Sequence, residues 1–154
     1  HGDMTPPKTL TRGRSWESLR AEFEAGLELF IACWRAPVRC VAIENPEMHD
    51  IARRRLPDDV PRPHIVQPFW FGHPEYKATG WYLRGLDPLV ETGRLAEPAK
   101  GSDEWRAWNR VWRMPPGAAR GHERSRFFPG MAAALADQWG RQALAMADRR
   151  EAAE

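Results

Sequence analysis

The chain has 154 residues, and its 23 Lys and Arg against 21 Asp and Glu leave a formal net charge of +2. A charge this small gives no bulk electrostatic sign of a nucleic-acid or membrane-surface protein. The length fits one domain, no apolar run approaches the roughly 20 residues of a membrane span, and we expect no membrane partner. Two Cys are too few for a disulfide framework, so a reduced, cytoplasmic setting is expected.

Apolar periodicity predicts a long helix near each end of the chain. After Ser15, which fits an N-cap, apolar residues recur every three or four positions and predict a helix over 15–35. A similar pattern in an Ala-rich background predicts a helix over 129–149. The expected organisation is therefore a flexible N-terminal segment over 1–14, a single α/β domain over 15–149 and a frayed tail over 150–154.

Short β-branched or alternating runs predict strands between these helices, at 38–43, 64–67 and 80–84. Short helices are expected over 47–55 and over 103–112, where three Trp are spaced three and four apart. A long helix followed by a buried strand is typical of α/β proteins. We therefore predict an α/β fold with a small, mainly parallel sheet flanked by helices.

The first candidate site is Glu44-Asn45-Pro46, at the end of the first predicted strand. The carboxyl ends of parallel strands are where α/β proteins place ligands, and a Glu there could hydrogen-bond a polar face of a substrate. The alternative is a turn that caps the strand, with Glu44 merely solvated.

The second candidate site is the segment 67–79, in which aromatic residues are mixed with His73 and Lys77. Aromatic rings and cations together can stack bases and bind phosphates. The alternative is a loop whose Phe and Trp residues plug the core. His73 has no second His or Cys at the spacing of metal ligands, so no metal site is expected.

The third candidate site is the segment 120–126, which places Arg120, Arg124 and Arg126 ahead of a predicted helix. Guanidinium groups and the free N–H groups of a helix start both favour anions, so these residues are candidate phosphate ligands. The alternative is a solvated turn in which the arginines pair with acidic neighbours such as Glu123.

Three blocks of the sequence, in this order, carry a family resemblance. The blocks read VAIENPEMH, QPFWFGHPEYKATGWYLRGLDPL and MPPGAARGHERSRFFPGMAAALADQWG. They resemble the later part of phage and prophage proteins of the cytosine 5-methyltransferase-like DNA methylase family. The similarity covers residues 38–90 and 113–140, and its ordered blocks make it more specific than any single motif.

The resemblance implies roles for particular residues. Glu44-Asn45 matches the first two residues of the family's Glu-Asn-Val motif, in which the Glu holds the target base and stabilises its protonated ring. The two residues would therefore be base-holding or vestigial. Lys77 stands at one of two cation positions in a later motif, while Thr79 stands at the other. Together with the three arginines of 120–126, Lys77 is then expected to bind nucleic acid.

Two departures from the family argue against independent methyl transfer. The chain lacks the glycine-rich turn that begins the methyl-donor pocket. The family's His-Pro-Pro-Cys-Thr loop is matched by residues 5–9, but Lys8 stands where the nucleophilic Cys should be. A Lys amine cannot replace a thiolate unless its pKa is strongly depressed. A minor alternative is that Lys8 acts as an amine nucleophile in base excision.

We therefore predict a DNA-modification-related protein that resembles a cytosine 5-methyltransferase, with the fold of a truncated methyltransferase core and no methyl-transfer activity of its own. No cofactor is expected from this chain alone, and S-adenosylmethionine would bind only if a partner supplied the pocket. A truncated core should expose a sheet edge or an apolar face, so a homo-oligomer or a partner subunit is expected beside DNA. The alternative is a non-catalytic protein-interaction module with a vestigial site.

Overall fold

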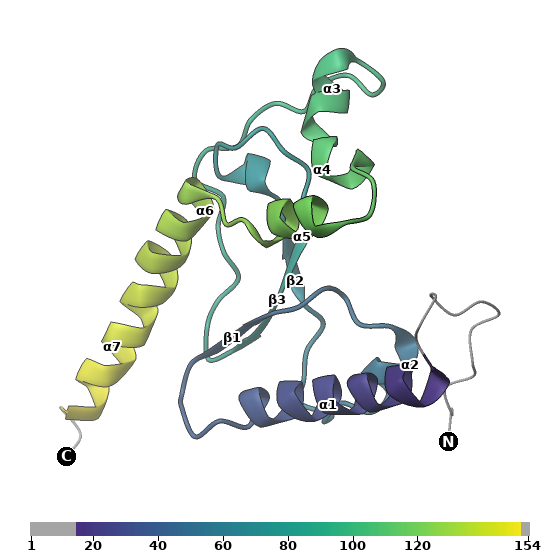
Figure 1. Cartoon of the computed structure of the whole chain (residues 1–154). Coiled ribbons are helices and arrows are strands. Elements are labelled where there is room, and N and C mark those ends of the chain that lie inside the picture. The colour runs from purple at the N-terminus through teal and green to yellow at the C-terminus, as the bar shows by residue number, and fades with distance from the viewer. Residues whose placement is uncertain (1–14, 152–154) are drawn as a thin grey trace.

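The computed structural model describes residues 15–151 and contains three strands surrounded by helices (Figure 1). In chain order the elements are α1 (Trp16–Trp34), β1 (Val41–Glu44), α2 (Asp50–Arg53), β2 (His64–Val66), the 3-10 turn η1 (Pro68–Trp70), β3 (Thr79–Arg84), α3 (Asp103–Trp108), α4 (Arg110–Arg113), α5 (Ala118–Ser125), α6 (Pro129–Ala134), the π-helical turn η2 (Leu135–Trp139) and α7 (Gly140–Glu151). The predicted segment 1–14, with Lys8, and residues 152–154 of the predicted tail lie outside the described residues. No helix within 15–151 is long and apolar enough to cross a membrane.

The sheet is antiparallel, so the prediction of a mainly parallel sheet is wrong. The strand order is β1-β3-β2, and β3 pairs antiparallel with both neighbours. The strands β1 and β2 do run in the same direction, but β3 lies between them and they never pair. No helix long enough to carry the chain back for parallel pairing lies between β2 and β3, where a 3-10 turn and a loop return it beside β2.

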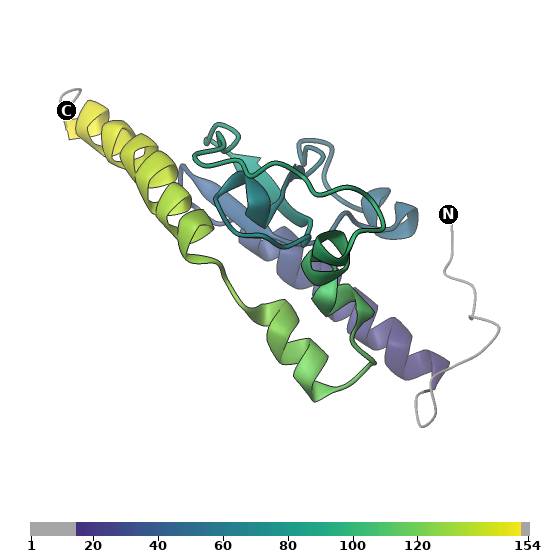
Figure 2. The same cartoon turned by 90° about the horizontal axis from the view of Figure 1, so that it is seen from above.

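The central strand β3 separates two hydrophobic cores. Tyr82 is fully buried on the side of α1, where its ring meets Phe30 edge-on at 5.0 Å between centroids. Trp81 points to the opposite side and meets Trp139 edge-on at 5.1 Å. Successive residues of a strand face opposite sides, so β3 joins α1 on one face to the C-terminal helix on the other (Figures 1 and 2).

The first long helix forms where it is predicted. Ser15 caps it, because its side chain accepts a hydrogen bond from the backbone N–H of Ser18 at 3.1 Å. Leu27, Phe30 and Trp34 follow at spacings of three and four and are all buried against the sheet. Full burial of an apolar side chain of this size contributes roughly 1.5–3 kcal/mol, so this stripe fixes the helix in place.

The second long helix is continuous from α6 through η2 to α7. The π-helical turn η2 lies in its first half, and side chains from this region bind the loop at 87–90. The backbone N–H of Val90 donates to Gln138 at 2.8 Å, and the N–H of Asp87 donates to Gln142 at 2.8 Å. The indole of Trp139 donates to the Asp87 carbonyl at 3.0 Å. Beyond this contact, Figures 1 and 2 show α7 projecting away from the other helices.

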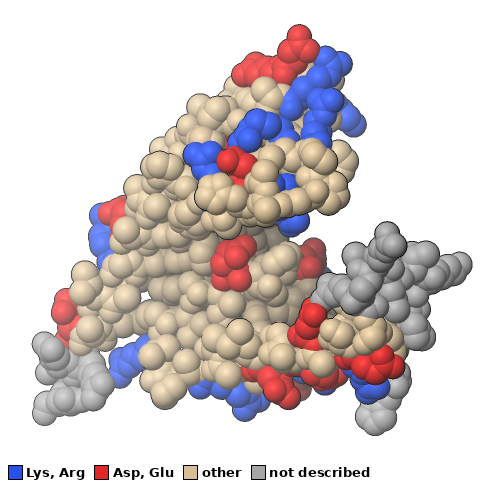
Figure 3. Space-filling view, viewed as in Figure 1, with Lys and Arg blue, Asp and Glu red and all other residues tan. Residues whose placement is uncertain are grey.

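Between β3 and α6 the chain forms three short helices. The predicted helix over 103–112 breaks at Asn109, so that α3 ends at Trp108 and α4 begins at Arg110. The segment 120–126, which was placed ahead of a helix from the sequence, is itself helical up to Ser125 as part of α5. Figure 2 shows α5 between α4 and the start of the long C-terminal helix. On the face drawn in Figure 3, Lys and Arg gather over α3–α5, above a hollow that separates them from α1.

Candidate functional site

The structure brings the second and third candidate segments together. The Lys77 ammonium donates a hydrogen bond to the carbonyl oxygen of Arg126 at 2.8 Å, across 49 residues of sequence. It also lies 5.4 Å from the centroid of the Phe128 ring. The segments 67–79 and 120–126, which were predicted as separate sites, therefore form one surface.

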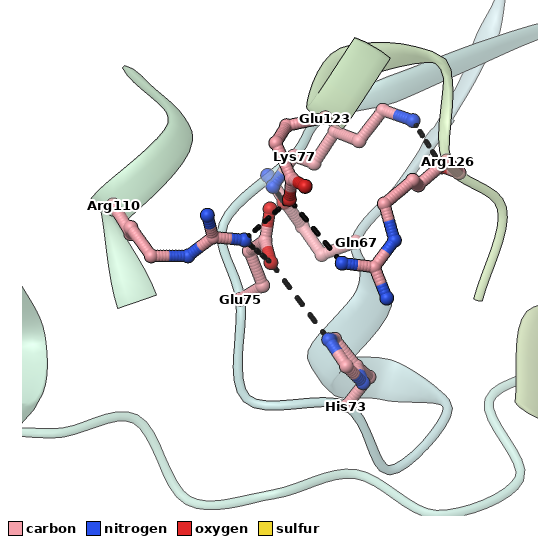
Figure 4. A network of polar contacts seen from close by, with 7 residues as sticks. All are labelled: Gln67, His73, Glu75, Lys77, Arg110, Glu123 and Arg126. Carbon is pink, nitrogen blue, oxygen red and sulfur yellow. Dashed lines mark hydrogen bonds and ion pairs between the residues drawn. The ribbon is translucent and has the colours of Figure 1, made fainter. Parts of the chain in front are cut away.

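Local backbone geometry shapes the first of these segments. After η1 the chain turns at Gly72, whose φ of +80° is strained for other residues. The backbone N–H of His73 then bonds back to Pro68 at 3.1 Å, and the N–H of Lys77 donates to the Gln67 side chain at 3.0 Å. These bonds close the loop on its own start and hold His73, Glu75 and Lys77 toward α5 (Figure 4).

A buried carboxylate, Glu75, lies in this loop. Its side chain is only 8% exposed, and one oxygen, Oε2, lies 3.7 Å from Nε2 of His73 and 3.8 Å from Nη2 of Arg110. The other oxygen, Oε1, is buried and has no hydrogen-bond partner among the described residues. Because an isolated buried carboxylate is costly, the nearby Arg110 charge stabilises Glu75 and links the loop to α4.

A second carboxylate, Glu123, links α4 to the end of α5. It accepts hydrogen bonds from Arg110 at 2.7 Å and from Arg126 at 3.3 Å (Figure 4). The hydrogen bond from Arg110 is the main cause that lowers the pKa of Glu123, and the same bond raises the pKa of Arg110. The guanidinium of Arg126, a predicted phosphate ligand, is therefore engaged in an ion pair within the protein.

A pocket of about 350 Å³ lies beside this network. Its walls are Tyr76, Lys77 and Ala78 from the loop before β3, Val111 and Trp112 from α4, and Arg120 and Arg124 from α5. Three of the four predicted nucleic-acid-binding residues thus line one pocket. Nε of Arg120 is buried without a hydrogen-bond partner, and no carboxylate within residues 15–149 forms an ion pair with Arg120 or Arg124.

The charge of Lys77 is tuned by its surroundings. Burial lowers the pKa of Lys77, and the nearby positive charge of Arg124 lowers it further. The carboxylates of Glu44 and Glu75 act in the opposite direction and raise it. The pKa of Lys77 therefore reflects burial and Arg124 on one side and the two carboxylates on the other.

The structure places Glu44 and Asn45 differently from the prediction made from the sequence. Glu44 is the exposed last residue of β1, and the Asn45 N–H donates to the Gly80 carbonyl at 2.9 Å. Because β1 pairs only with an antiparallel strand, its end does not meet the carboxyl end of a parallel neighbour, and that reason for a ligand site is wrong. Asn45 lines a separate groove of about 240 Å³ beside α1, with Phe23 and Met48.

Several site residues were missed from the sequence. Trp112 was assigned to the apolar face of one helix over 103–112, yet it is 75% exposed because the chain breaks at Asn109. Glu75 and Arg110 were not singled out, since nothing local marks a carboxylate that becomes buried beside a distant arginine. The pairing of Arg126 with Glu123, three residues apart, was the alternative given for segment 120–126, and the structure contains this ion pair.

The arrangement is suited to anion binding by cations next to an exposed aromatic ring. Within the described part of the chain, no group of three or more His, Cys, Asp or Glu side chains lies close enough to hold a metal ion. Comparison with protein-family models, with curated proteins and with solved structures finds no match to this chain.

Proposed function

We propose that this protein binds nucleic acid in a DNA-modification role, using the pocket between α4, α5 and the loop before β3. One observation carries the proposal: Lys77, Arg120 and Arg124 converge on one pocket from segments far apart in sequence. Folding alone does not account for their convergence, because like charges repel and no described carboxylate pairs with either arginine. A phosphate backbone would supply the missing negative charge.

The contrast with neighbouring arginines supports this proposal. Arg110 and Arg126 both bind Glu123 and so serve the protein's own structure. Arg120 instead keeps a buried Nε–H with no acceptor, which a phosphate oxygen in the pocket could satisfy. The pocket is thus lined by positive charges, whereas the charges of Arg110 and Arg126 beside it are neutralised by Glu123.

Methyl transfer is not part of the activity that we propose for this chain by itself. The reaction needs a thiolate beside the target base, and neither cysteine of residues 15–151 lines the pocket. Cys33 lies in α1, and Cys40 contacts the carbonyl of Gly85 and the sulfur of Met146. Glu44 would remain available to hydrogen-bond a base edge near Lys77.

Binding of labelled DNA, measured by fluorescence anisotropy at several salt concentrations, tests the proposal. The double variant Arg120→Ala with Arg124→Ala removes two phosphate contacts. Its slope of log affinity against log salt should therefore be shallower by about 2 than that of the wild type. The matched control removes two exposed arginines of α7, Arg141→Ala with Arg149→Ala, and should keep the wild-type slope. Salt-independent binding, or equal slopes in both variants, would contradict the proposal.

A second candidate function is a protein-interaction module, favoured by apolar groups that stay exposed near β1. Among the described strands, β1 pairs along one edge only. Cys40 contacts Met146 at 3.3 Å. Val38, two residues before Cys40, and Leu144, two residues before Met146, have exposed side chains. Light scattering after size exclusion should then show a mass above 17.7 kDa that Leu144→Glu lowers to the monomer. A monomer at every concentration would contradict self-association.

A further inference from the structure

One tryptophan is set apart from the other seven. Trp112 is 75% exposed, whereas the remaining seven of the chain are buried or half-buried. It forms part of the wall of the basic pocket, beside Arg120 and Arg124. A tryptophan side chain carries a large apolar surface, so its exposure here is not explained by packing of the protein.

The backbone forces the indole outward. The helix α4 has only four residues, and its Val111 is buried against the core. The next residue on a helix points about 100° away, so Trp112 faces solvent when Val111 faces inward. Within residues 15–151, Trp112 takes part in none of the close ring pairs or cation–ring contacts, and its face is free.

The inference rests on the proposed function and names its substrate class. We propose that the pocket takes single-stranded nucleic acid, with one unpaired base stacked on Trp112 and the adjoining phosphates held by Arg120 and Arg124. In a duplex each base face is covered by its neighbours, so an indole can stack only where a base is unpaired or flipped out. Cations along a groove with an aromatic ring for the bases are typical of single-strand binding.

The size of the pocket agrees with this assignment. A volume of about 350 Å³ lies at the lower end of the range of about 300–1,000 Å³ found for small-ligand sites. Such a space suits one nucleotide unit. Tyr76 and Val111 add apolar wall beside the cations, against which a base can pack.

The experiment compares three labelled probes: a short mixed-sequence single strand, the same strand with abasic sites in place of its nucleosides, and the corresponding duplex. Wild type should bind the intact single strand most tightly. Trp112→Ala should weaken binding of that strand by about tenfold, which is the usual effect of losing one stacked base. The same variant should change binding of the abasic strand and of the duplex by less than twofold. Trp112→Phe should retain most of the affinity, because it keeps an aromatic face.

Two further proteins separate stacking from general effects. Leu144→Ala, which removes another exposed apolar side chain on α7, should bind all three probes as the wild type does. Arg120→Ala with Arg124→Ala should lose affinity for all three probes, because each carries phosphates. Thermal unfolding of Trp112→Ala should match the wild type, since the indole is exposed.

The outcomes distinguish this inference from the function on which it rests. Salt-dependent binding with a duplex preference, or equal losses by Trp112→Ala on the intact and abasic strands, would overturn the single-strand assignment and leave nucleic-acid binding intact. Absence of salt-dependent binding to every probe would overturn both.

Discussion

The side chain of Glu123 joins three parts of the site, because both Arg110 and Arg126 donate hydrogen bonds to it. Arg110 also approaches Glu75, and Lys77 holds the Arg126 carbonyl, so the loop before β3, α4 and α5 meet through these contacts (Figure 4). The network keeps α5 in position and thereby sets where Arg120 and Arg124 point.

The charge of Glu123 should make the stability of the protein depend on pH. Its pKa is lowered in the folded protein, so it binds its proton more weakly there than in the unfolded chain. The stabilisation is therefore complete above the ordinary pKa of a Glu and is lost as the pH falls through the lowered value. At pH 7 the variant Glu123→Gln should melt at a lower temperature than the wild type.

That difference in melting temperature should shrink as the pH falls below the ordinary Glu range, where the wild-type side chain also becomes neutral. Thermal unfolding followed by circular dichroism from pH 7 to strongly acidic buffer measures it. The control Glu28→Gln alters an exposed Glu of α1 and should show no such pH-dependent difference. A difference that stays constant with pH would contradict the role given to the Glu123 charge.

The cationic residues that line the pocket were named from the sequence, but their arrangement could not be predicted. Lys77, Arg120 and Arg124 were named because their charges suit phosphate, and the structure places all three on one pocket. Trp112 was missed, since its exposure depends on a helix break at Asn109 that the Trp spacing does not reveal. The contact between Lys77 and Arg126 spans 49 residues, and local patterns carry no information over that separation.

At the scale of elements, the start of α6 packs unusually closely on the loop after η1. A side chain at Gly130 would collide with the carbonyl oxygen of Phe71. This close approach aligns Phe128 and Met131 with the core on that side of the sheet. Position 130 therefore requires glycine because of this close contact with Phe71, and not because of an unusual backbone angle.

The substitution Gly130→Ala should consequently destabilise the protein by about 1–3 kcal/mol, since the added methyl group must displace backbone. Gly140→Ala is the matched control, because it lies in the same long helix with open space around it. There the change should stabilise the protein by roughly 0.5–1 kcal/mol through helix propensity. Urea unfolding of the two variants measures both effects, and equal stabilities would contradict the close packing of Gly130.

The two long helices were predictable from the sequence, whereas α5 and the direction of the strands were not. The apolar spacing and the Ser15 cap are local signals, and α1 forms over nearly the predicted range. The three predicted strands also exist within a few residues of their expected positions. Whether two strands pair as parallel or antiparallel depends on the path of the chain between them, and the loop over 67–78 is compatible with either until its turn at Gly72 is known.

At the scale of the whole molecule, a small net charge does not exclude an uneven distribution of basic residues over the surface. The formal charge is only +2, yet Lys and Arg gather over α3–α5 on the face in Figure 3. Four acidic residues lie in α1, on the other side of the hollow. Net charge is therefore a poor guide to the ligands that this protein attracts, because electrostatic attraction of a ligand depends on the local field at the pocket.

The π-helical turn Leu135–Trp139 sets the phase of the C-terminal helix, that is, the direction in which the side chains of α7 point. In a regular α-helix, the five steps from Ala134 to Trp139 would rotate about 140°, yet both side chains lie in the same core. The wider turn accommodates the extra residue, and Gln138 and Gln142 face the 87–90 loop as a result. Deleting one residue within this turn would leave a regular α-helix with α7 in the same phase, whereas deleting one at the start of α7 would rotate the residues beyond it by about 100°. The helix should therefore tolerate a shortening inside the π-helical turn better than one in α7.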